Sequence, residues 1–551
     1  MNLNSLFRRK SISSLDAESN DKSQLHKVLG VKDLTFLGVA AIVGAGIFST
    51  IGRASYEGGP AVSLLFILVA TACIFTALCY AQFASMIPIS GSAYTYTYAS
   101  LGEIFAWVIG WALLLEYAVS NMVVAISWSE YFTTMLAGFG VHWPGWLEID
   151  YGSAKAAFIQ VRDAHVGDHI PDSVLKAAKS YASAPEMGGI KILFDLPAGL
   201  VTLFITFVVY IGIKESKNLS NLLVYLKLGV ILLVIIAGSF FVKPENWSPF
   251  LPNGFGGVMG GVAAVFFAFI GFDSISTTAE EAKNPQKDLP KAMIYCLIIC
   301  TVLYVVLSLI LTGMVNYKEL KVDDPLAYVF GKVDMNFIAG IISVSAVISI
   351  TSTLLVYQIG QPRIWMSMSR DGLLGKKFGE INKKYRTPGF STLLTGVIVG
   401  IPAMFLDMQF VVDLTSVGTF FAFILVCSGT LYLEHKGETQ KAKFKIPYIN
   451  SQFITGIGFI LSLFFLFTQT DYESLIKEKP LLVIFWIVWA ALSIATLKYK
   501  FSLLPVLGIL FNFYLMTELG WSNWLMFIFW LLIGLAIYFL YSYKNSKLNK
   551  K

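Results

Sequence analysis

Long apolar runs separated by short polar segments recur along almost the whole chain. Crossing about 30 Å of hydrocarbon at 1.5 Å per residue takes about 20 apolar residues in a helix. The first half of the sequence predicts such helices at 34–56, 61–86, 104–136, 195–213, 219–241, 257–282 and 292–315. The second half predicts them at 334–367, 390–406, 409–433, 452–469, 480–498, 502–518 and 522–543. The pattern therefore predicts an all-α polytopic membrane protein with about 14 transmembrane helices.

Two of these runs are interrupted by glycines, in GVAAIVGAGIF at 38–48 and in VFFAFIGFDS at 265–274. A break leaves backbone N–H and C=O groups unpaired at mid-bilayer, so it is tolerated only against protein or a polar cavity. A matched pair of such breaks is typical of the binding site of a membrane transporter. The alternative is that Gly44, Gly46 and Gly271 only let neighbouring helices pack closely.

The two breaks fall in the first and the sixth predicted helix, which start on opposite sides of the membrane. This arrangement predicts two inverted five-helix repeats, residues 31–241 and 255–434, followed by four C-terminal helices within 450–543. The longest loop, 137–194, is predicted to be a small external cap inserted in the first repeat.

Basic residues gather in the loops on the side of the two termini, such as Lys376, Lys377, Lys383 and Lys384. The positive-inside rule makes that side cytoplasmic. We therefore expect a multi-pass protein of the plasma or inner membrane, with cytoplasmic tails at 1–30 and 544–551.

Composition agrees with a membrane protein and excludes other classes. Hydrophobic residues make up 56% of the chain and charged residues 14%, with a mean hydropathy of +0.68, whereas soluble domains carry about one quarter charged residues. The net charge of +6 comes from short loops, which does not indicate nucleic-acid binding. The five cysteines lie in apolar runs without metal spacing, so neither a metal nor a cofactor is expected. HExxH, GxSxG and P-loop motifs are missing, which argues against an enzyme.

The ends of the broken helices suggest the chemistry of a ligand. After the first break a helix begins near Gly46, and its N–H groups and positive dipole end suit a carboxylate. Before the second break a helix ends near Ala268, and its carbonyls suit an ammonium group. A ligand with both groups close together is an α-amino acid. The residues expected to bind it at the breaks are Ile42, Gly44, Ala45, Gly46, Ile47, Phe267, Ala268 and Ile270.

Lys227 lies within a long apolar run, NLLVYLKLGVILLVIIAG, about 12 Å from the cytoplasmic end of its helix. A lysine near mid-membrane costs about 2.5–3.5 kcal/mol on insertion scales, so partners or a function should compensate. The alternatives are snorkelling and a static hydrogen bond. Because burial penalises the charged amine, the lysine could gain and lose a proton during a transport cycle.

Two carboxyl residues within the predicted helices leave their roles open. Asp273 follows the Gly271 break, where it either senses protons and gates the inner pathway or caps the next half-helix. Glu116 lies in the middle of 104–136, where it either attracts a cationic side chain or pairs with another helix. Tyr94, Tyr96 and Tyr98 occupy every second position, which predicts an aromatic belt at the membrane interface.

Several longer motifs resemble a known family. They are GAGIF, PISGSAYTYTYASLGE, GWALLLEY, FFAFIGFDSISTTAEEAKNPQKDLP, GQPRIWMSMSRDGLL and DLTSVGTFFAFILVCSGTLYL. From about residue 30 to its C-terminus the chain resembles the amino acid, polyamine and organocation superfamily, and within it the cationic-amino-acid-transporter branch and its bacterial relatives. The resemblance implies the leucine-transporter fold of two inverted repeats, alternating access, and an amino acid held at the breaks. It leaves open whether that amino acid is neutral or cationic.

The resemblance also implies a role for Lys227. A lysine at the matching place in helix five takes the position of a sodium ion of sodium-coupled relatives, bridging helices one, five and eight. Its expected partners are carbonyls near Ala40 and Val43 and the hydroxyls of Ser352 and Thr353. The expected function is proton-coupled uptake of amino acids across a lipid bilayer. An obligate exchanger and a nutrient receptor that binds without transporting are the alternatives, and no oligomeric state is predicted.

Overall fold

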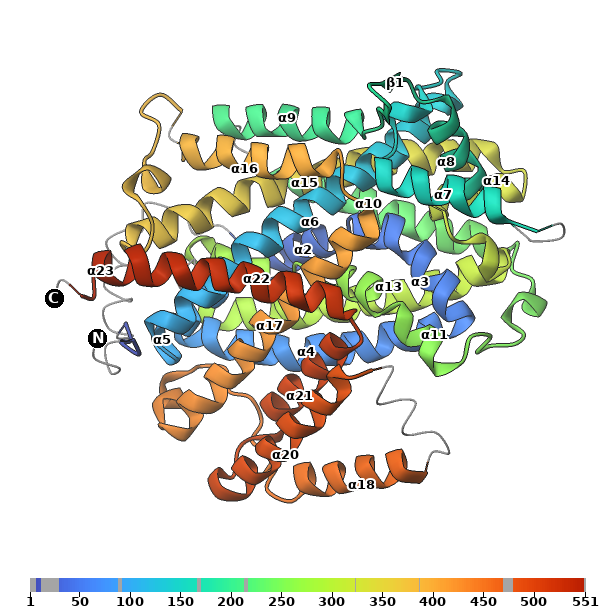
Figure 1. The fold of residues 1–551 in the computed structure, drawn as a ribbon. Helices are drawn as coiled ribbons and strands as arrows, with labels where there is room; N and C mark the ends of the chain where they lie inside the picture. Colours follow the sequence, from blue (N-terminus) through green and yellow to red (C-terminus); the bar gives the residue numbers. More distant parts are fainter. Residues whose placement is uncertain are drawn as a thin grey trace.

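The computed structural model describes residues 6–10, 29–87, 92–165, 170–212, 217–322, 324–385, 387–468 and 479–549. Its long helices run side by side in one bundle (Figure 1). The first part of the bundle contains α2 (Val31–Ile42), η2 (Gly46–Thr50), α3 (Ile51–Gly58), η3 (Gly59–Ala61), α4 (Val62–Met86), α5 (Ser92–Ser100), α6 (Glu103–Gly138), α9 (Leu196–Ile211) and α10 (Lys217–Ser239).

The second part begins with a helix in three pieces. It contains α11 (Gly254–Gly260), α12 (Val262–Phe267), η6 (Phe272–Glu281), α13 (Pro285–Met314), α14 (Pro325–Lys332), α15 (Asn336–Arg370), α16 (Gly389–Ala403) and α17 (Met408–His435). The C-terminal part contains α18 (Ile454–Thr468), α20 (Leu481–Tyr499), α21 (Leu503–Thr517), α22 (Trp521–Ile537), η10 (Tyr538–Ser542) and α23 (Tyr543–Asn545).

Many of these helices can cross a bilayer, which confirms a polytopic membrane protein. Among the described residues, eight are long and apolar enough, and α11 with α12 and η6 forms a ninth candidate bent by 42°. Four further apolar helices, α9, α16, α18 and α21, are shorter. The short length of α9 has a local cause. The helix ends at Gly212, which has a φ of +82°, a conformation that ends helices and favours glycine. The predicted number of about 14 crossings and the inverted repeats remain predictions.

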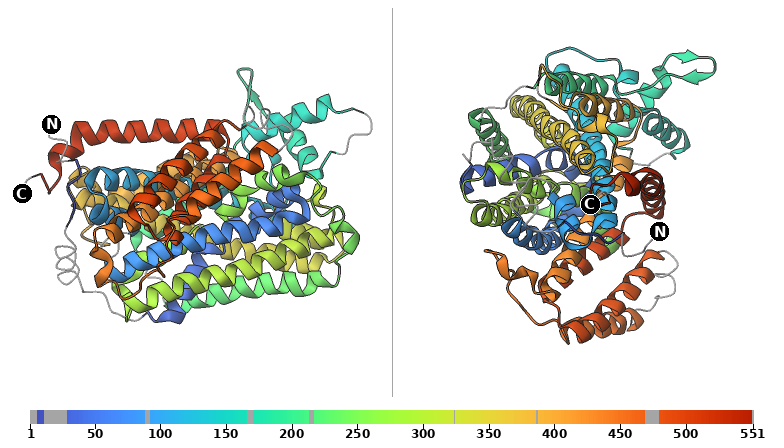
Figure 2. Two further views of the ribbon diagram at one scale, coloured as in Figure 1. Left: turned by 90° about the horizontal axis from the view of Figure 1, so that it is seen from below. Right: turned by 90° about the vertical axis from the view of Figure 1, so that its left-hand side faces the viewer.

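Helix α6 forms the centre of the bundle. It packs most extensively against α15 and α17 and also contacts α5, α9, α16 and α22. Helix α13 packs against α4 and α2, and α10 joins α2, α13 and α15. The C-terminal α18, α20 and α21 make an outer layer at one side of the bundle, which is attached through α21 to α17 and α4 (Figure 2).

The predicted cap is a folded insertion at one end of the bundle (Figure 1). It contains η4 (Gly145–Leu147), α7 (Tyr151–Asp163), α8 (Asp172–Ser183) and the antiparallel pair β1 (Glu186–Met187) and β2 (Ile190–Lys191). Asp150 caps α7 by accepting a 2.9 Å hydrogen bond from the Ser153 N–H. The Ser153 hydroxyl donates a 2.9 Å bond to Asp407, the capping residue of α17. The cap is therefore tied to the start of a bundle helix.

The prediction of an aromatic belt at Tyr94, Tyr96 and Tyr98 is wrong. All three side chains are buried, because α5 packs against α6 and α17 and does not face lipid. The Tyr94 hydroxyl donates a 2.7 Å bond to Asp371, and the Tyr98 hydroxyl a 2.9 Å bond to Glu103. These tyrosines thus hold helices together at the end of the bundle where the chain termini meet.

Candidate functional site

The first interrupted helix breaks where the sequence predicts it. Helix α2 ends at Ile42, residue Val43 has an extended backbone, and helical structure resumes at Gly46 as one turn of π-helix. The N–H groups of Ile47 and Phe48 both donate to the Gly44 carbonyl, at 3.1 and 3.2 Å. The N–H groups of residues 47 and 48 are therefore already used by the chain's own turn.

The second interrupted helix breaks after Phe267. Two tight turns follow, in which the Phe269 N–H donates to the Phe266 carbonyl at 2.8 Å and the Ile270 N–H to the Phe267 carbonyl at 3.2 Å. Gly271 then has a φ of +116°, and a 3-10 helix begins after it. The expected freed carbonyl of residue 267 thus has one donor already, and a carbonyl oxygen can accept a second one.

The two breaks touch each other through their glycines. A side-chain carbon placed on Gly46 would lie 2.4 Å from the Ala268 Cα and 2.8 Å from its nitrogen. A carbon placed on Gly271 would lie 3.0 Å from the carbonyl carbon and oxygen of Ala41. The glycines therefore permit close packing of the two helices at the very points where the helices break. Both breaks are buried, with Ala45 and Ala268 each 1% exposed, so the site is closed to solvent.

Tyrosine and threonine side chains hold the first break in place. The Tyr304 hydroxyl donates to the Ile42 carbonyl at 3.3 Å, and the Tyr131 hydroxyl donates to the Phe48 carbonyl at 2.6 Å. Thr50 donates to the Ala264 carbonyl of the second broken helix at 2.9 Å. Sequence reasoning missed these residues, because a hydroxyl in an apolar run gives no sign of which carbonyl it will meet.

Lys227 reaches across the bundle to the first break. Its Nζ donates 2.9 Å hydrogen bonds to the Ala40 carbonyl and to the Thr353 hydroxyl. The side chain is only 1% exposed, which excludes snorkelling to the membrane surface. Helices α10, α2 and α15 are thereby joined at one ammonium group. Two of the four predicted partners, Ala40 and Thr353, are in place.

The other predicted partners lie differently. The Ser352 hydroxyl donates to the Ser349 carbonyl of its own helix at 2.8 Å, a common use of serine in membrane helices. Val43 lies in the extended linker of the break. A carbon placed on Gly44 would lie 2.9 Å from Thr353 Cγ2, so Thr353 packs against the first break while it binds Lys227.

Glu116 and Asp273 lie near each other inside the bundle and interact electrostatically. Both are buried, at 3% and 4% exposure. The Ser92 hydroxyl donates to Asp273 Oδ2 at 3.5 Å. Gly271 occupies the capping position before η6 and has no side chain to cap it, and Asp273 lies in the first turn of that helix. The structure thus places two carboxyl groups beside the second break.

The N-terminal segment 6–10 closes one end of the bundle. Arg8 forms an ion pair with the buried Glu103 at 3.2 Å, and Lys10 forms one with Asp371 at 2.6 Å. Glu103 also accepts hydrogen bonds from Tyr98, Tyr538 and Ser546. The N-terminal segment, α5, α6 and the C-terminal helix therefore meet at one carboxylate.

A helical bundle with two broken helices in contact, and a buried lysine bridging one of them, defines a polytopic membrane protein of the type used by secondary transporters. Comparison with known proteins identifies the family. Residues 29–492 match the family described as amino acid permease, and residues 502–546 match the C-terminal region of such permeases. The chain belongs to the amino acid permease family, which confirms the resemblance seen in its motifs.

Individual relatives extend over the whole chain. A branched-chain amino acid permease, BcaP, of Bacillus subtilis is 38% identical over 547 residues, covering 99% of both chains. A methylthioribose transporter of the same organism is 37% identical over 549 residues, covering 100% of both. The vacuolar cationic amino acid transporter 4 of Arabidopsis thaliana is 30% identical over 618 residues, covering 99% of this chain and 97% of the relative. All three are named as transporters or permeases, in agreement with a protein that is not an enzyme.

Proposed function

We propose that this protein is a secondary-active permease that imports amino acids by alternating access, with proton coupling through Lys227. The single observation that carries the proposal is the lysine bridge from α10 to the first broken helix, at Ala40 and Thr353. The proposal includes a leucine-transporter-type fold, with repeats at 31–241 and 255–434 and about 14 crossings. The termini lie on the cytoplasmic side of the plasma or inner membrane in this scheme.

The amino acid backbone would bind between the two breaks. Since residues 47 and 48 are already paired, the carboxylate would take the N–H groups of residues 44–46, at the positive end of the following helix. The ammonium group would take carbonyls at Ala268 and Ile270. Because Gly46 now packs directly against Ala268, the two breaks must separate to admit a substrate.

The proton would act through the strength of the lysine bridge. A protonated lysine donates charge-assisted hydrogen bonds, which are about twice as strong as neutral ones. When the amine loses its proton, its hold on Ala40 and Thr353 weakens and α2 is freed to move. The neighbour of Ala40, Ala41, packs against Gly271 of the second break. A movement of α2 would therefore reach both halves of the binding site.

Transport by purified protein in proteoliposomes tests the coupling. We expect Lys227→Met to lose accumulation driven by a pH gradient while it keeps exchange of labelled for unlabelled substrate. Lys32→Met is the matched control, because Lys32 lies on α2 but is exposed, and it should transport normally. If Lys227→Met still accumulates substrate in proportion to the gradient, Lys227 is not the coupling site.

The same preparation separates the alternative functions. An obligate exchanger would show counterflow but no net uptake when the vesicles are empty. A nutrient receptor would bind amino acids and show no flux at all. Net uptake into empty vesicles under an inward proton gradient would exclude both.

The side chain of the substrate has two candidate classes, neutral and cationic. The name of one bacterial relative, a branched-chain amino acid permease, favours a neutral substrate, whereas the buried carboxyl pair of Glu116 and Asp273 favours a cationic one. Competition of arginine, lysine, alanine and leucine for uptake distinguishes them. If arginine is the substrate, Glu116→Gln should weaken arginine uptake more than leucine uptake, and equal effects on both would assign the pair a structural role.

A further inference from the structure

The loop between α15 and α16 carries two pairs of lysines within the stretch KKFGEINKKY at 376–385. It lies at the end of the bundle where the chain termini meet (Figure 1). Its four lysines and Glu380 are all exposed and give the stretch a net charge of +3. No ion pair with a residue that the structure describes involves Lys376, Lys377, Lys383 or Lys384.

The acidic groups nearest in the chain to this loop are already used. The N-terminal segment 6–10 takes the carboxylate of α6 and that of Asp371, the residue after α15. Asp371 also accepts a hydrogen bond from Tyr94. The loop's own Glu380 offsets one of its four positive charges. Within the described part of the chain, the two lysine pairs therefore form a positive patch, which we call the lysine loop, residues 376–385.

Asn382 fixes the shape of the lysine loop around its second lysine pair. The side-chain oxygen of Asn382 accepts hydrogen bonds from the N–H groups of Lys384 and Tyr385, at 2.9 and 3.2 Å. Its side-chain nitrogen donates to the Tyr210 hydroxyl of α9 at 3.1 Å. The second pair is thus held at the end of α9.

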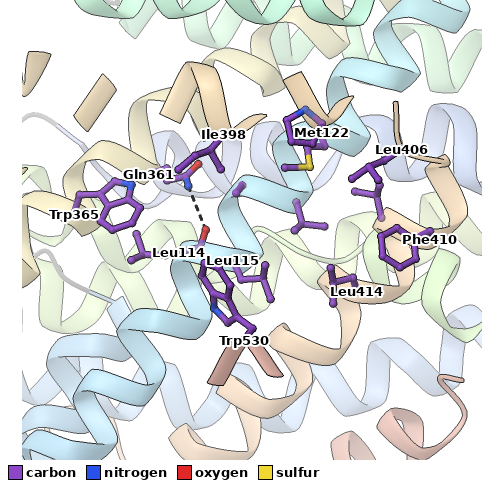
Figure 3. Close-up of a pocket in the computed structure, with 14 residues that line it drawn as sticks. Leu114, Leu115, Met122, Gln361, Trp365, Ile398, Leu406, Phe410, Leu414 and Trp530 are labelled. Carbon is purple, nitrogen blue, oxygen red and sulfur yellow. Dashed lines mark hydrogen bonds between the residues drawn. The ribbon is translucent and has the colours of Figure 1, made fainter. Parts of the chain in front are cut away.

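The first lysine pair is anchored through Phe378, the next residue along the chain. The Phe378 ring stacks on Trp365 of α15, with 5.1 Å between ring centres, and its carbonyl accepts a 2.9 Å bond from the Ser391 hydroxyl of α16. Trp365 in turn lines an apolar cavity beside α6 (Figure 3). The lysine loop is therefore braced against three helices, so that binding a ligand costs little ordering of its backbone.

The surface next to the lysine loop is apolar. Helices α9 and α16 pack against each other, and each carries a row of exposed apolar side chains. The row on α16 is Phe390, Leu393, Val397 and Ile401, between 46% and 55% exposed. In a membrane helix bundle such a row meets lipid chains. Because Phe390 is the second residue of α16, this row reaches the lysine loop.

Ile381 distinguishes this loop from one that only sets the orientation of the protein. It stands between the two lysine pairs and is 49% exposed. Positive charge alone is sufficient for the positive-inside rule, and an exposed apolar side chain adds nothing to it. Lysines beside exposed apolar side chains are instead typical of segments at the membrane interface, where amines meet headgroups and apolar groups meet acyl chains.

We propose that the lysine loop binds the headgroup of an anionic phospholipid at this surface of the membrane. The phosphate of the lipid accepts hydrogen bonds from a lysine pair, and its acyl chains contact Ile381 and Phe390. A zwitterionic lipid carries its own cation, which the lysines repel, so it binds more weakly. Because the loop joins α15 to α16, a bound lipid holds the connection between these two helices.

Native mass spectrometry of the purified full-length protein in detergent tests the proposal. Dioleoylphosphatidylglycerol is the anionic probe and dioleoylphosphatidylcholine the zwitterionic one. We expect the anionic lipid to bind the unchanged protein more tightly, by about 5-fold for each lysine that contacts it. Raising ammonium acetate from about 0.05 to 0.5 M should narrow this difference, since salt screens exposed charges. Glycerol phosphate, which lacks acyl chains, should not displace the lipid at equal concentration.

Variants of exposed side chains locate the binding surface. The anionic lipid should bind no better than the zwitterionic one to a fourfold variant with Lys376→Gln, Lys377→Gln, Lys383→Gln and Lys384→Gln. Ile381→Ser should weaken binding of both lipids by about 3-fold. A matched control makes the same change of net charge at four other exposed lysines and should keep the preference, with Lys155→Gln, Lys179→Gln, Lys443→Gln and Lys445→Gln.

A second experiment needs no variant. Phosphatidylglycerol with a photoreactive diazirine in its acyl chain, irradiated with the unchanged protein in membranes, should label peptides from 376–397 more than the matching phosphatidylcholine probe. The proposal is overturned if both lipids bind equally, if the fourfold variant keeps the preference, or if the matched control loses it as well. Displacement by glycerol phosphate as effective as by lipid, or labelling only outside 376–397, would also overturn it.

Discussion

Lys227 and Ala40 are 187 positions apart in the chain, yet the lysine Nζ lies 2.9 Å from the alanine carbonyl oxygen. The contact joins α10 to the last turns of α2, directly before the helix breaks. Ala40 is among the last four residues of α2, whose carbonyls lack a partner within the helix, so the lysine both satisfies this carbonyl and restrains the position of α2. Thr353 completes the bridge from α15, and the first prediction concerns this residue.

Thr353→Val should reduce gradient-driven uptake by about tenfold, because it removes one hydrogen bond to a charged group. Valine keeps the shape of threonine and its packing on Gly44, so the loss isolates the hydroxyl. Thr353→Ser should recover most of the activity. The neighbouring Ser352→Ala is the control, since the Ser352 hydroxyl bonds its own helix. Equal loss in Thr353→Val and Ser352→Ala would contradict a specific role for the bridge.

Gly46→Ala should abolish uptake and lower stability by about 1–3 kcal/mol, the usual cost of overpacking a close contact. The added carbon would lie 2.4 Å from the backbone of Ala268, so the two breaks could not approach as they do here. Gly229→Ala is the control on α10, because a carbon at Gly229 meets nothing within 4 Å. Uptake assays and thermal unfolding measure both effects. Normal transport by Gly46→Ala would show that the closed contact is not part of the cycle.

Arg8→Ala should lower thermal stability by about 1–3 kcal/mol, since it leaves the buried Glu103 with fewer partners. It should also let trypsin cut at Arg9 and Lys10 faster, because the segment loses its ion pair with α6. Arg9→Ala is the control: its pair with Glu438 at 3.3 Å is partly exposed on both sides, and such pairs contribute under about 1 kcal/mol. If both variants behave alike, the segment is not held by Glu103.

Trp111→Phe should destabilise the docking of α22 by about 0.5–1.5 kcal/mol. The change keeps an aromatic ring against Trp530, stacked at 4.5 Å between ring centres, but removes one of the two reciprocal hydrogen bonds. A double-mutant cycle with Trp530→Phe measures the coupling of the two rings, and Trp521→Phe controls for loss of an exposed indole. Strictly additive effects of the two changes would show that the reciprocal bonds contribute nothing together.

The location of the breaks followed from the sequence alone. Glycines inside apolar runs marked the stretches 38–48 and 265–274 as interrupted, because lipid cannot satisfy unpaired backbone groups and such a break is kept only against protein or a polar cavity. The cost of a lysine at mid-membrane marked Lys227 in the same way. Both signals are local, since each depends on one residue type set against an apolar surrounding. The membrane class and the family resemblance were also predicted from short stretches of sequence, namely apolar runs and motifs.

Tertiary structure alone decided which groups meet. Thr353 and Ser352 are equivalent by sequence, and only the rotation of α15 turns one toward Lys227 and the other toward its own helix. The tyrosines of α5 occupy every second position, which predicts an aromatic belt at the membrane interface, yet packing against α6 and α17 buries them. Contacts between helices depend on rotations and crossing positions set by the whole bundle, which the pattern of a single segment does not contain.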